Sequence, residues 1–165
     1  MFSKQESTSL RKEFWTCFGK SFPRKWLLYN TKIKGLSFKF VANRKNAMIC
    51  LDIEHADEMV NKILFDKILS LKTILKEDYV SEVIFDDSYI LKNGKSIHRI
   101  YINHREKFSI YNKDTWSSCY EFYIEIMPKF ELFFYEYRDI ITVFNFLISR
   151  IEYLKDNLVV DYYLL

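Results

Sequence analysis

The stretch LSFKFVANRKNAMICLDIEHADEMVNKILFDKILSLKTIL, residues 36–75, decides the fold of this chain. It opens with two runs, Leu36–Phe40 and Ala47–Ile53, in which apolar residues occupy alternate positions. A period of two is typical of half-buried β-strands. The polar run Asn43–Asn46 between them has the length of a loop that joins antiparallel strands. The sequence therefore predicts a β-hairpin here.

The hydrophobic pattern also predicts the register of this hairpin. Pairing Ala42 with Ala47 brings the large apolar residues of both strands to one face, and a slip of one residue would expose them. The opposite face is then polar and carries Asp52 and Glu54 two residues apart.

After Glu54 the pattern changes to steps of three and four residues. Apolar residues recur in this way from Met59 to Leu75, with lysines and acids between them. This spacing predicts an amphipathic helix of about five turns. Asp57 has the position and chemistry of its N-cap.

The second half predicts another pair of strands. Apolar residues alternate from Val83 to Leu91 and again over residues 100–102, with Asn93-Gly94 between the two runs. Asn-Gly favours a two-residue turn with positive φ at both positions. We expect Lys92 to pair with Lys95.

Two more helices are expected at the ends of the chain. Ser7 or Ser9 can cap a first helix that ends near Phe18. Aromatic residues and Met127 form a heptad-like seam over residues 116–137, which predicts a long buried helix. Pro128 is expected to kink or split it.

Together these elements predict an α+β fold. Its core is a four-stranded antiparallel sheet made of two hairpins, packed on one face by two or three long helices, in the order α-β-β-α-β-β-α. We expect residues 1–140 to form a single domain. Residues 141–165 are expected to be an apolar C-terminal extension, helical and packed on the same domain.

Composition and compartment signals favour the cytosol. The chain is 49% hydrophobic, which excludes a disordered protein, and its three cysteines are odd in number and widely spaced, which favours reduced thiols. The first residues lack the apolar segment of a secretory signal. The most apolar stretch, residues 130–148, is interrupted by charged residues and fails as a membrane span. We expect a cytoplasmic protein with no membrane partner.

Charge is distributed unevenly along the chain. Residues 1–50 hold eleven basic and two acidic residues, a balance of +9, and the remainder carries −6. Cations interleaved with aromatic rings suit a nucleic-acid surface, because cations neutralise phosphates and rings stack on bases. The alternative is that these residues are solvated or pair with the acidic second half of the same chain. The candidate binding residues, from this segment and from the polar sheet face, are Lys20, Arg24, Lys25, Trp26, Lys32, Lys34, Lys39, Arg44, Lys45, Arg99 and Tyr101.

Several short segments resemble a bacterial family known only as a domain of unknown function, DUF4268. The similarity lies in Leu10–Gly19, Leu28–Lys34, Ile53–His55, Arg99–Tyr101 and Asn112–Trp116, and extends to about Arg138. Members of that family occur alone or as the C-terminal part of larger proteins whose N-terminal part looks like a restriction-type nuclease. The resemblance implies an accessory role near DNA or a nuclease-type partner protein, and it implies no catalytic residue.

A catalytic site is weakly indicated. Asp52, Glu54 and Glu13 are candidate carboxylates for a divalent metal in a restriction-type nuclease, but the acidic-x-Lys pair that such a site requires is missing. The three histidines are too scattered for a zinc pattern, and no glycine loop that could cradle phosphate is present. We therefore expect no metal site and no cofactor.

Three functions remain open from the sequence. The first is a non-catalytic binding module that accompanies nucleic-acid-processing or defence machinery. The second is a divalent-metal nuclease that uses the three carboxylates. The third is a protein-interaction or homodimer module that uses the aromatic segment 130–148. The polar sheet face, with Lys39, Asp52, Glu54, Asp86, Arg99 and Tyr101, is either a binding surface or a set of cross-strand ion pairs on a solvated face.

Overall fold

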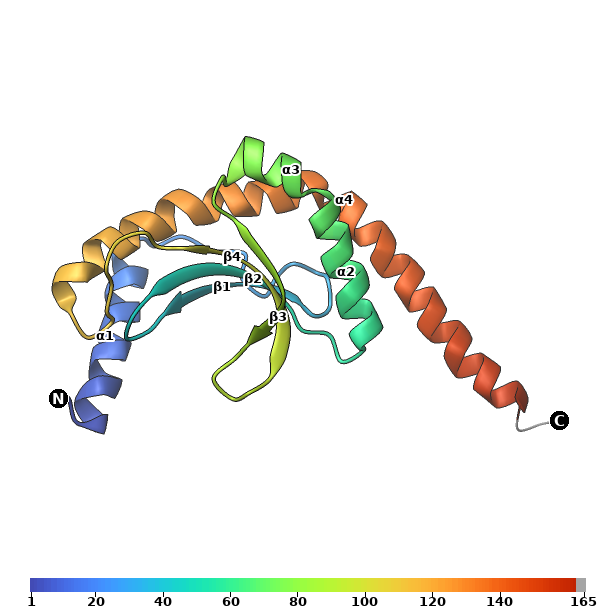
Figure 1. The fold of residues 1–165 in the computed structure, drawn as a ribbon, viewed down its shortest axis with the longest axis horizontal. Helices are drawn as coiled ribbons and strands as arrows, with labels where there is room; N and C mark the ends of the chain where they lie inside the picture. The colour runs from blue at the N-terminus through green and yellow to red at the C-terminus, as the bar shows by residue number, and fades with distance from the viewer. Residues whose placement is uncertain (163–165) are drawn as a thin grey trace.

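The structure is a computed structural model that describes residues 1–162, without the side chains of residues 143–146, 148 and 159–162. Its elements in chain order are α1 (Lys4–Ser21), β1 (Leu36–Ala42), β2 (Ala47–Ile53), α2 (Glu58–Ser70), α3 (Lys72–Ile74), the π-helical turn η1 (Leu75–Tyr79), β3 (Ile84–Ile90), β4 (Ser96–Asn103), the 3₁₀ turn η2 (Lys113–Thr115) and α4 (Trp116–Tyr162). The predicted α+β class and element order are confirmed (Figure 1).

The four strands form one antiparallel sheet in the order β1-β2-β4-β3. In the first hairpin Ala42 pairs with Ala47, and Phe38 pairs with Leu51, so the predicted register is confirmed. Asn43 closes the loop: its N–H donates to the carbonyl of Asn46 at 3.0 Å.

The predicted register of the second hairpin is wrong. The N–H of Leu91, not of Lys92, donates to the carbonyl of Lys95, and of the loop residues only Gly94 has a positive φ. The loop therefore has three residues and ends in a left-handed glycine, the second most common hairpin solution after the two-residue turn. A bulge between Asp86 and Tyr89 shifts the register by one more residue.

The helices pack on one face of the sheet, and α4 runs across the top of it in Figure 1. The ring of Phe38 in β1 lies 5.2 Å from Phe130 and 5.8 Å from Phe134 of α4. The hydroxyl of Tyr123 donates to the carbonyl of Val41 at 2.6 Å, which ties α4 to β1. A single hydrophobic core results, with residues from α1, the sheet, α2 and α4.

The predicted seam of α4 is the core seam, because Tyr123, Met127, Phe130 and Phe134 are fully buried. We expected Pro128 to kink or split this helix, and the helix continues through it without a split. Part of segment 130–148 belongs to the core, since Phe133 and Ile141 are fully buried as well. Leu132, Tyr135 and Ile140 of the same segment are exposed.

Helix α2 begins as predicted, with Asp57 as its N-cap accepting from the N–H of Met59 at 2.9 Å, but it ends at Ser70. The following residues form α3 and η1. Within the described residues, no helix combines the length and the hydropathy needed to cross a membrane.

Candidate functional site

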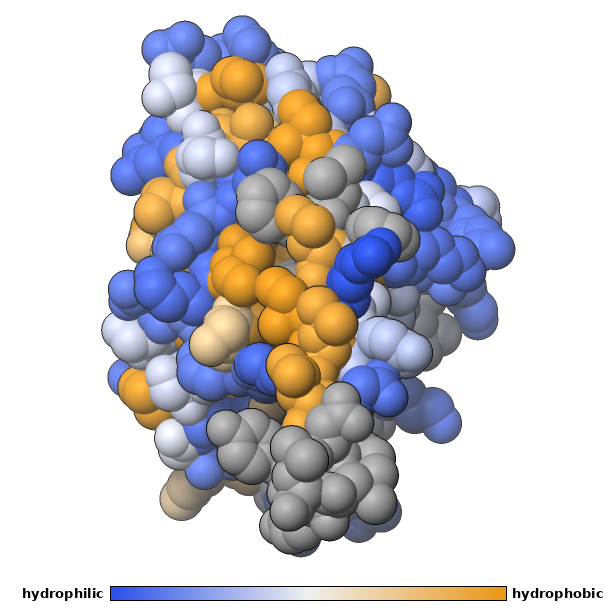
Figure 2. Space-filling view, turned by 90° about the vertical axis from the view of Figure 1, so that its right-hand side faces the viewer, coloured by the Kyte–Doolittle hydropathy of each residue, from blue (hydrophilic) through white to orange (hydrophobic). Residues whose placement is uncertain are grey.

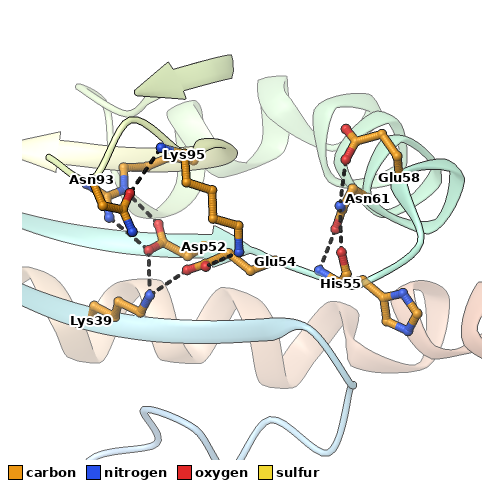
Figure 3. A network of polar contacts seen from close by, with 9 residues as sticks. Lys39, Asp52, Glu54, His55, Glu58, Asn61, Asn93 and Lys95 are labelled. Carbon is orange, nitrogen blue, oxygen red and sulfur yellow. Dashed lines mark hydrogen bonds and ion pairs between the residues drawn. The ribbon is translucent and has the colours of Figure 1, made fainter. Parts of the chain in front are cut away.

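A network of ion pairs occupies the sheet face opposite the helices (Figure 3). Asp52 of β2 lies beside Arg99 of β4, and two hydrogen bonds of 2.7 and 2.8 Å join the guanidinium to both carboxylate oxygens. The ammonium of Lys39 in β1 lies 2.9 Å from Asp52 and 2.8 Å from Glu54. Lys95 reaches the other oxygen of Glu54 at 3.1 Å. Residues from three strands thus form one continuous network.

The centre of this network is buried, which corrects the expectation of a solvated face. Asp52 is fully buried and Arg99 is 5% exposed. The bulge in β3 turns Tyr89 to this face, and its ring lies 4.3 Å from the guanidinium of Arg99 and 5.5 Å from the ring of Tyr101. The β3–β4 hairpin therefore covers the ion pairs.

The electrostatics of the network favour fixed charges. Burial acts to lower the pKa of Lys39, but its hydrogen bonds to Glu54 and Asp52 outweigh burial and raise that pKa above its ordinary value. The hydrogen bond from Lys39, with a further one from Lys95, lowers the pKa of Glu54. Burial raises the pKa of the neighbouring Cys50 thiol to about 12, so this cysteine is a poor nucleophile.

The arrangement gives the carboxylates little capacity for a metal ion. Two carboxylates, Asp52 and Glu54, face three cations. Glu13, the third candidate, lies on α1 and pairs with Lys113 of η2. Among the residues that the structure describes, no group of three or more histidine, cysteine or acidic side chains is arranged to hold a metal.

The polar residues that follow β2 hold the strand to α2. The side chain of Asn61, 5% exposed, accepts from the N–H of His55 at 2.6 Å and donates to its carbonyl at 2.9 Å. Glu58 accepts from the same amide (Figure 3). Its carboxylate also lies 3.1 Å from Nε2 of His98. Sequence reasoning missed Asn61, although an asparagine among the apolar positions of a helix was a visible signal.

The basic N-terminal residues lie along the free edge of the sheet. β1 is an edge strand, and the segment from residue 22 to residue 35 runs beside it, with the N–H of Phe38 donating to the carbonyl of Leu28 at 2.9 Å. The β1–β2 loop carries two further cations. We call the exposed cations of this region the basic edge: Lys20, Lys25, Lys32, Lys34, Arg44 and Lys45. None of them forms an ion pair with any residue that the structure describes.

Two of the predicted binding residues in this region have structural contacts. Arg24 pairs with Glu131 of α4 at 3.1 Å and stacks on Trp26 at 4.3 Å. Trp26 in turn packs against Phe40 at 5.1 Å. The N–H of Leu27 donates to Glu131 at 2.9 Å, so this acid anchors the segment to α4. Lys39 and Arg99 belong to the buried network, and Tyr101 is half-buried beside it.

The anchored segment presents one exposed aromatic ring. Tyr29 is 74% exposed and lies between two residues in the left-handed region, Leu28 with φ 42° and Lys32 with φ 62°. The buried hydroxyl of Thr31 contacts Leu36 at 2.7 Å and fixes the turn. Strained backbone of this kind persists only where its surroundings hold it, and it gathers at functional sites.

Fold and surface together define a small α+β domain with a buried ion-pair network on one sheet face and an unpaired basic edge. A family model described as a domain of unknown function, DUF4268, matches residues 10–138. The chain belongs to this family. No curated protein and no solved structure matches it.

Proposed function

We propose that this chain is a non-catalytic binding module that holds nucleic acid along the basic edge. The observation that carries the proposal is the set of six exposed cations without acidic partners among the described residues. Cations of this kind neutralise phosphates and release condensed counterions, which drives binding. The proposal includes a cytosolic location and an accessory role beside nucleic-acid-processing machinery.

Tyr29 makes a single strand the better ligand. Unstacked bases pack on exposed aromatic rings, whereas a duplex offers its bases only in the grooves. The turn that carries Tyr29 is held by Thr31 and lies between Lys25 and Lys32 in the chain. Cations for the phosphates and one stacking platform therefore belong to the same segment, and the buried network serves to hold the sheet.

The first test measures binding of labelled single-stranded and duplex DNA by fluorescence anisotropy over a range of salt concentrations. We expect the triple variant Lys25→Ala, Lys32→Ala, Lys34→Ala to bind more weakly. On a single strand its salt slope should be smaller by about 0.7 for each phosphate that the variant no longer neutralises. The matched control changes three exposed lysines elsewhere, Lys4, Lys12 and Lys107. Equal weakening in both triples, or no binding by the wild type at low salt, would remove the proposal.

The second test isolates the stacking platform. Tyr29→Ala should weaken single-strand binding by about 1–3 kcal/mol and leave duplex binding unchanged, and Tyr29→Phe should retain the affinity. Tyr135→Ala is the control, because Tyr135 is 54% exposed on α4. If Tyr29→Ala and Tyr135→Ala behave alike, the base-stacking role is wrong even where the lysine result holds.

A further inference from the structure

The two ends of the molecule differ in the chemistry of their surface. Figure 2 shows a band of hydrophobic residues on the side where α4 leaves the sheet. At the opposite end, beside α1 in Figure 1, a cleft of about 420 Å³ is lined by side chains of α1 and of both hairpins. Small-molecule sites in proteins have volumes of about 300–1,000 Å³, so this cleft has room for an organic ligand.

The charged residues that line this cleft are all cations. They are Arg11 of α1, Arg99 of β4 and Lys92 of the β3–β4 loop. Lys92 is exposed and forms no ion pair with any residue that the structure describes. The acids of β3, Asp86 and Asp87, do not line the cleft. Its charge therefore suits an anion.

The buried network holds Arg99 in place for such an anion. Nε and Nη2 of Arg99 donate to the two carboxylate oxygens of Asp52, and the ring of Tyr89 lies 4.3 Å from the guanidinium. Nη1 donates to no described residue, so its N–H groups remain for a ligand in the cleft that Arg99 lines. An arginine that is fixed before the ligand arrives loses little side-chain entropy on binding.

Two asparagines of the cleft add further donors. Oδ1 of Asn43 accepts from the N–H groups of Lys45 and Asn46 at 2.9 and 3.0 Å. Oδ1 of Asn93 accepts from the N–H of Lys95 at 3.0 Å. Each loop thus uses the oxygen of its asparagine, and neither Nδ2 group has an acceptor among the described residues. A phosphate group, whose oxygens accept strong hydrogen bonds, matches these free donors and the cations beside them.

The remaining lining is apolar and aromatic. Val41 and Tyr89 are half-buried and Met48 is buried, and all three line the cleft. Aromatic rings and methionine thioethers pack well against planar rings. An inorganic anion would leave this part of the cleft empty, whereas a ligand with both a phosphate and a planar ring uses both parts. A nucleotide combines the two.

We propose that this cleft binds a nucleotide, with its phosphate on Arg11, Lys92 and Arg99 and its base beside Met48 and Tyr89. A free mononucleotide and the phosphorylated end of a nucleic-acid strand present the same chemistry to these residues. None of the three cations belongs to the basic edge, so this proposal and the proposed strand binding fail or hold separately.

The test is isothermal titration calorimetry of the full chain with adenosine monophosphate at low salt. We expect saturable binding, and binding weaker by about tenfold or more for adenosine or inorganic phosphate alone. Lys92→Ala should weaken binding of the mononucleotide by about tenfold, because it removes one charge-assisted hydrogen bond. Lys12→Ala is the matched control and should bind like the wild type. Lys12 is also exposed and without an ion pair among the described residues, but it does not line the cleft.

Competition identifies the source of the nucleotide. Displacement of adenosine monophosphate by a short oligonucleotide only when that strand carries a terminal phosphate supports the end of a strand, and no displacement by either form supports a free mononucleotide. Equal displacement by both forms would overturn the proposal, because the phosphate would then play no part.

Three results of the titrations would also overturn it. They are no binding by the wild type, inorganic phosphate binding as tightly as the mononucleotide, and equal weakening in Lys92→Ala and Lys12→Ala. Both lysines are exposed, so circular dichroism should show an unchanged fold in each variant. If Lys92→Ala nevertheless fails to fold, Lys92→Gln carries the test, since it keeps the length of the side chain and removes its charge.

Discussion

Asp52 carries a negative charge at a position with no exposure to water. A buried carboxylate is tolerated only when it is paired and hydrogen-bonded, and Arg99 and Lys39 meet that need. The ring of Tyr89 lies over the guanidinium of Arg99 and keeps water from the pair. The stability of the sheet should therefore depend on the side chain of Asp52.

Removing this carboxylate should be costly. Asp52→Ala leaves Arg99 and Lys39 without their shared partner, and we expect a decrease of about 3–5 kcal/mol in the free energy of unfolding. Urea denaturation followed by circular dichroism measures it. Lys62→Ala removes a solvent-exposed pair with Asp66 and should cost less than about 1 kcal/mol. Similar decreases in the two variants would show that the network contributes no more than surface pairs.

Glu54 gives the network a predictable pH dependence. The hydrogen bonds from Lys39 and Lys95 lower its pKa in the folded state, so its contribution to stability is present above the unfolded-state value of about 4.3. That contribution is lost as the pH falls through the lower, folded-state pKa. Glu54→Gln should therefore flatten the acid limb of the stability profile, measured by urea midpoints between neutral and acidic pH. An unchanged acid limb would contradict the pairing.

Glu131 should act in the opposite direction. Burial raises its pKa despite hydrogen bonds from Leu27 and Arg24, so the folded state holds its proton more tightly than the unfolded chain does. Its contribution to stability falls as the pH rises from the unfolded-state value to the folded-state pKa. Glu131→Gln should accordingly make the decline of stability toward acid steeper, in the same urea series. A slope equal to that of the wild type would mean that burial does not govern this acid.

The place of Asp52 in the sheet was predictable from the sequence, but its burial was not. The alternation in β2 puts Asp52 on the face opposite the helices, and that face is confirmed. Its complete burial does not follow from this alternation, because the cover comes from Tyr89 through a bulge in a distant strand.

At the scale of elements, the hydrophobic spacing correctly predicted those helices and strands that depend on interactions between residues close in sequence. In the first hairpin apolar residues alternate strictly, so only one face can be buried. In α4 the apolar residues form one long buried seam. The predicted register of the second hairpin was wrong because the loop has three residues, where Asn-Gly indicated two. Alternation counted through the bulge also puts Phe85 and Tyr89 on one face, whereas Phe85 packs near Phe65 at 6.1 Å and Tyr89 lies on the other side.

Two other element boundaries were missed for different reasons. α1 begins earlier than predicted, with Ser3 and Glu6 in a capping box, a signal that was visible in the sequence. The wide turn η1 follows α2 because Tyr79 packs on Phe133, a contact between distant residues that no local pattern contains.

Gly35 offers a test of how tightly β1 is joined to the end of β2. It has φ +82°, and a Cβ there would meet the backbone of His55 at 2.9 Å. Gly94 has φ +84° and open space around it. Gly94→Ala should therefore cost only the conformational strain, about 1 kcal/mol, while Gly35→Ala should cost clearly more. Thermal melts of both variants make the comparison, and equal shifts would show that the backbone gives way at His55.

At the scale of the molecule, the sequence located the basic segment but could not distinguish its free cations from its paired ones. Arg24 and Lys39 carry the same charge as Lys25 and Lys32. Arg24 pairs with Glu131, and Lys39 pairs with Asp52 and Glu54. These partners become neighbours only when the sheet and α4 assemble. The candidate surface is thus smaller than the predicted set, and Tyr29 rather than Trp26 is its exposed ring.

Helix α4 contributes its first half to the core, and past Ile141 none of its described side chains is buried. The outer half of the helix runs away from the sheet in Figure 1. Its amides are protected mainly by the hydrogen bonds of the helix itself, so local opening should release them without unfolding of the domain. Hydrogen exchange followed by mass spectrometry should therefore show residues 147–158 exchanging well before residues 120–134, and equal protection along the helix would contradict this.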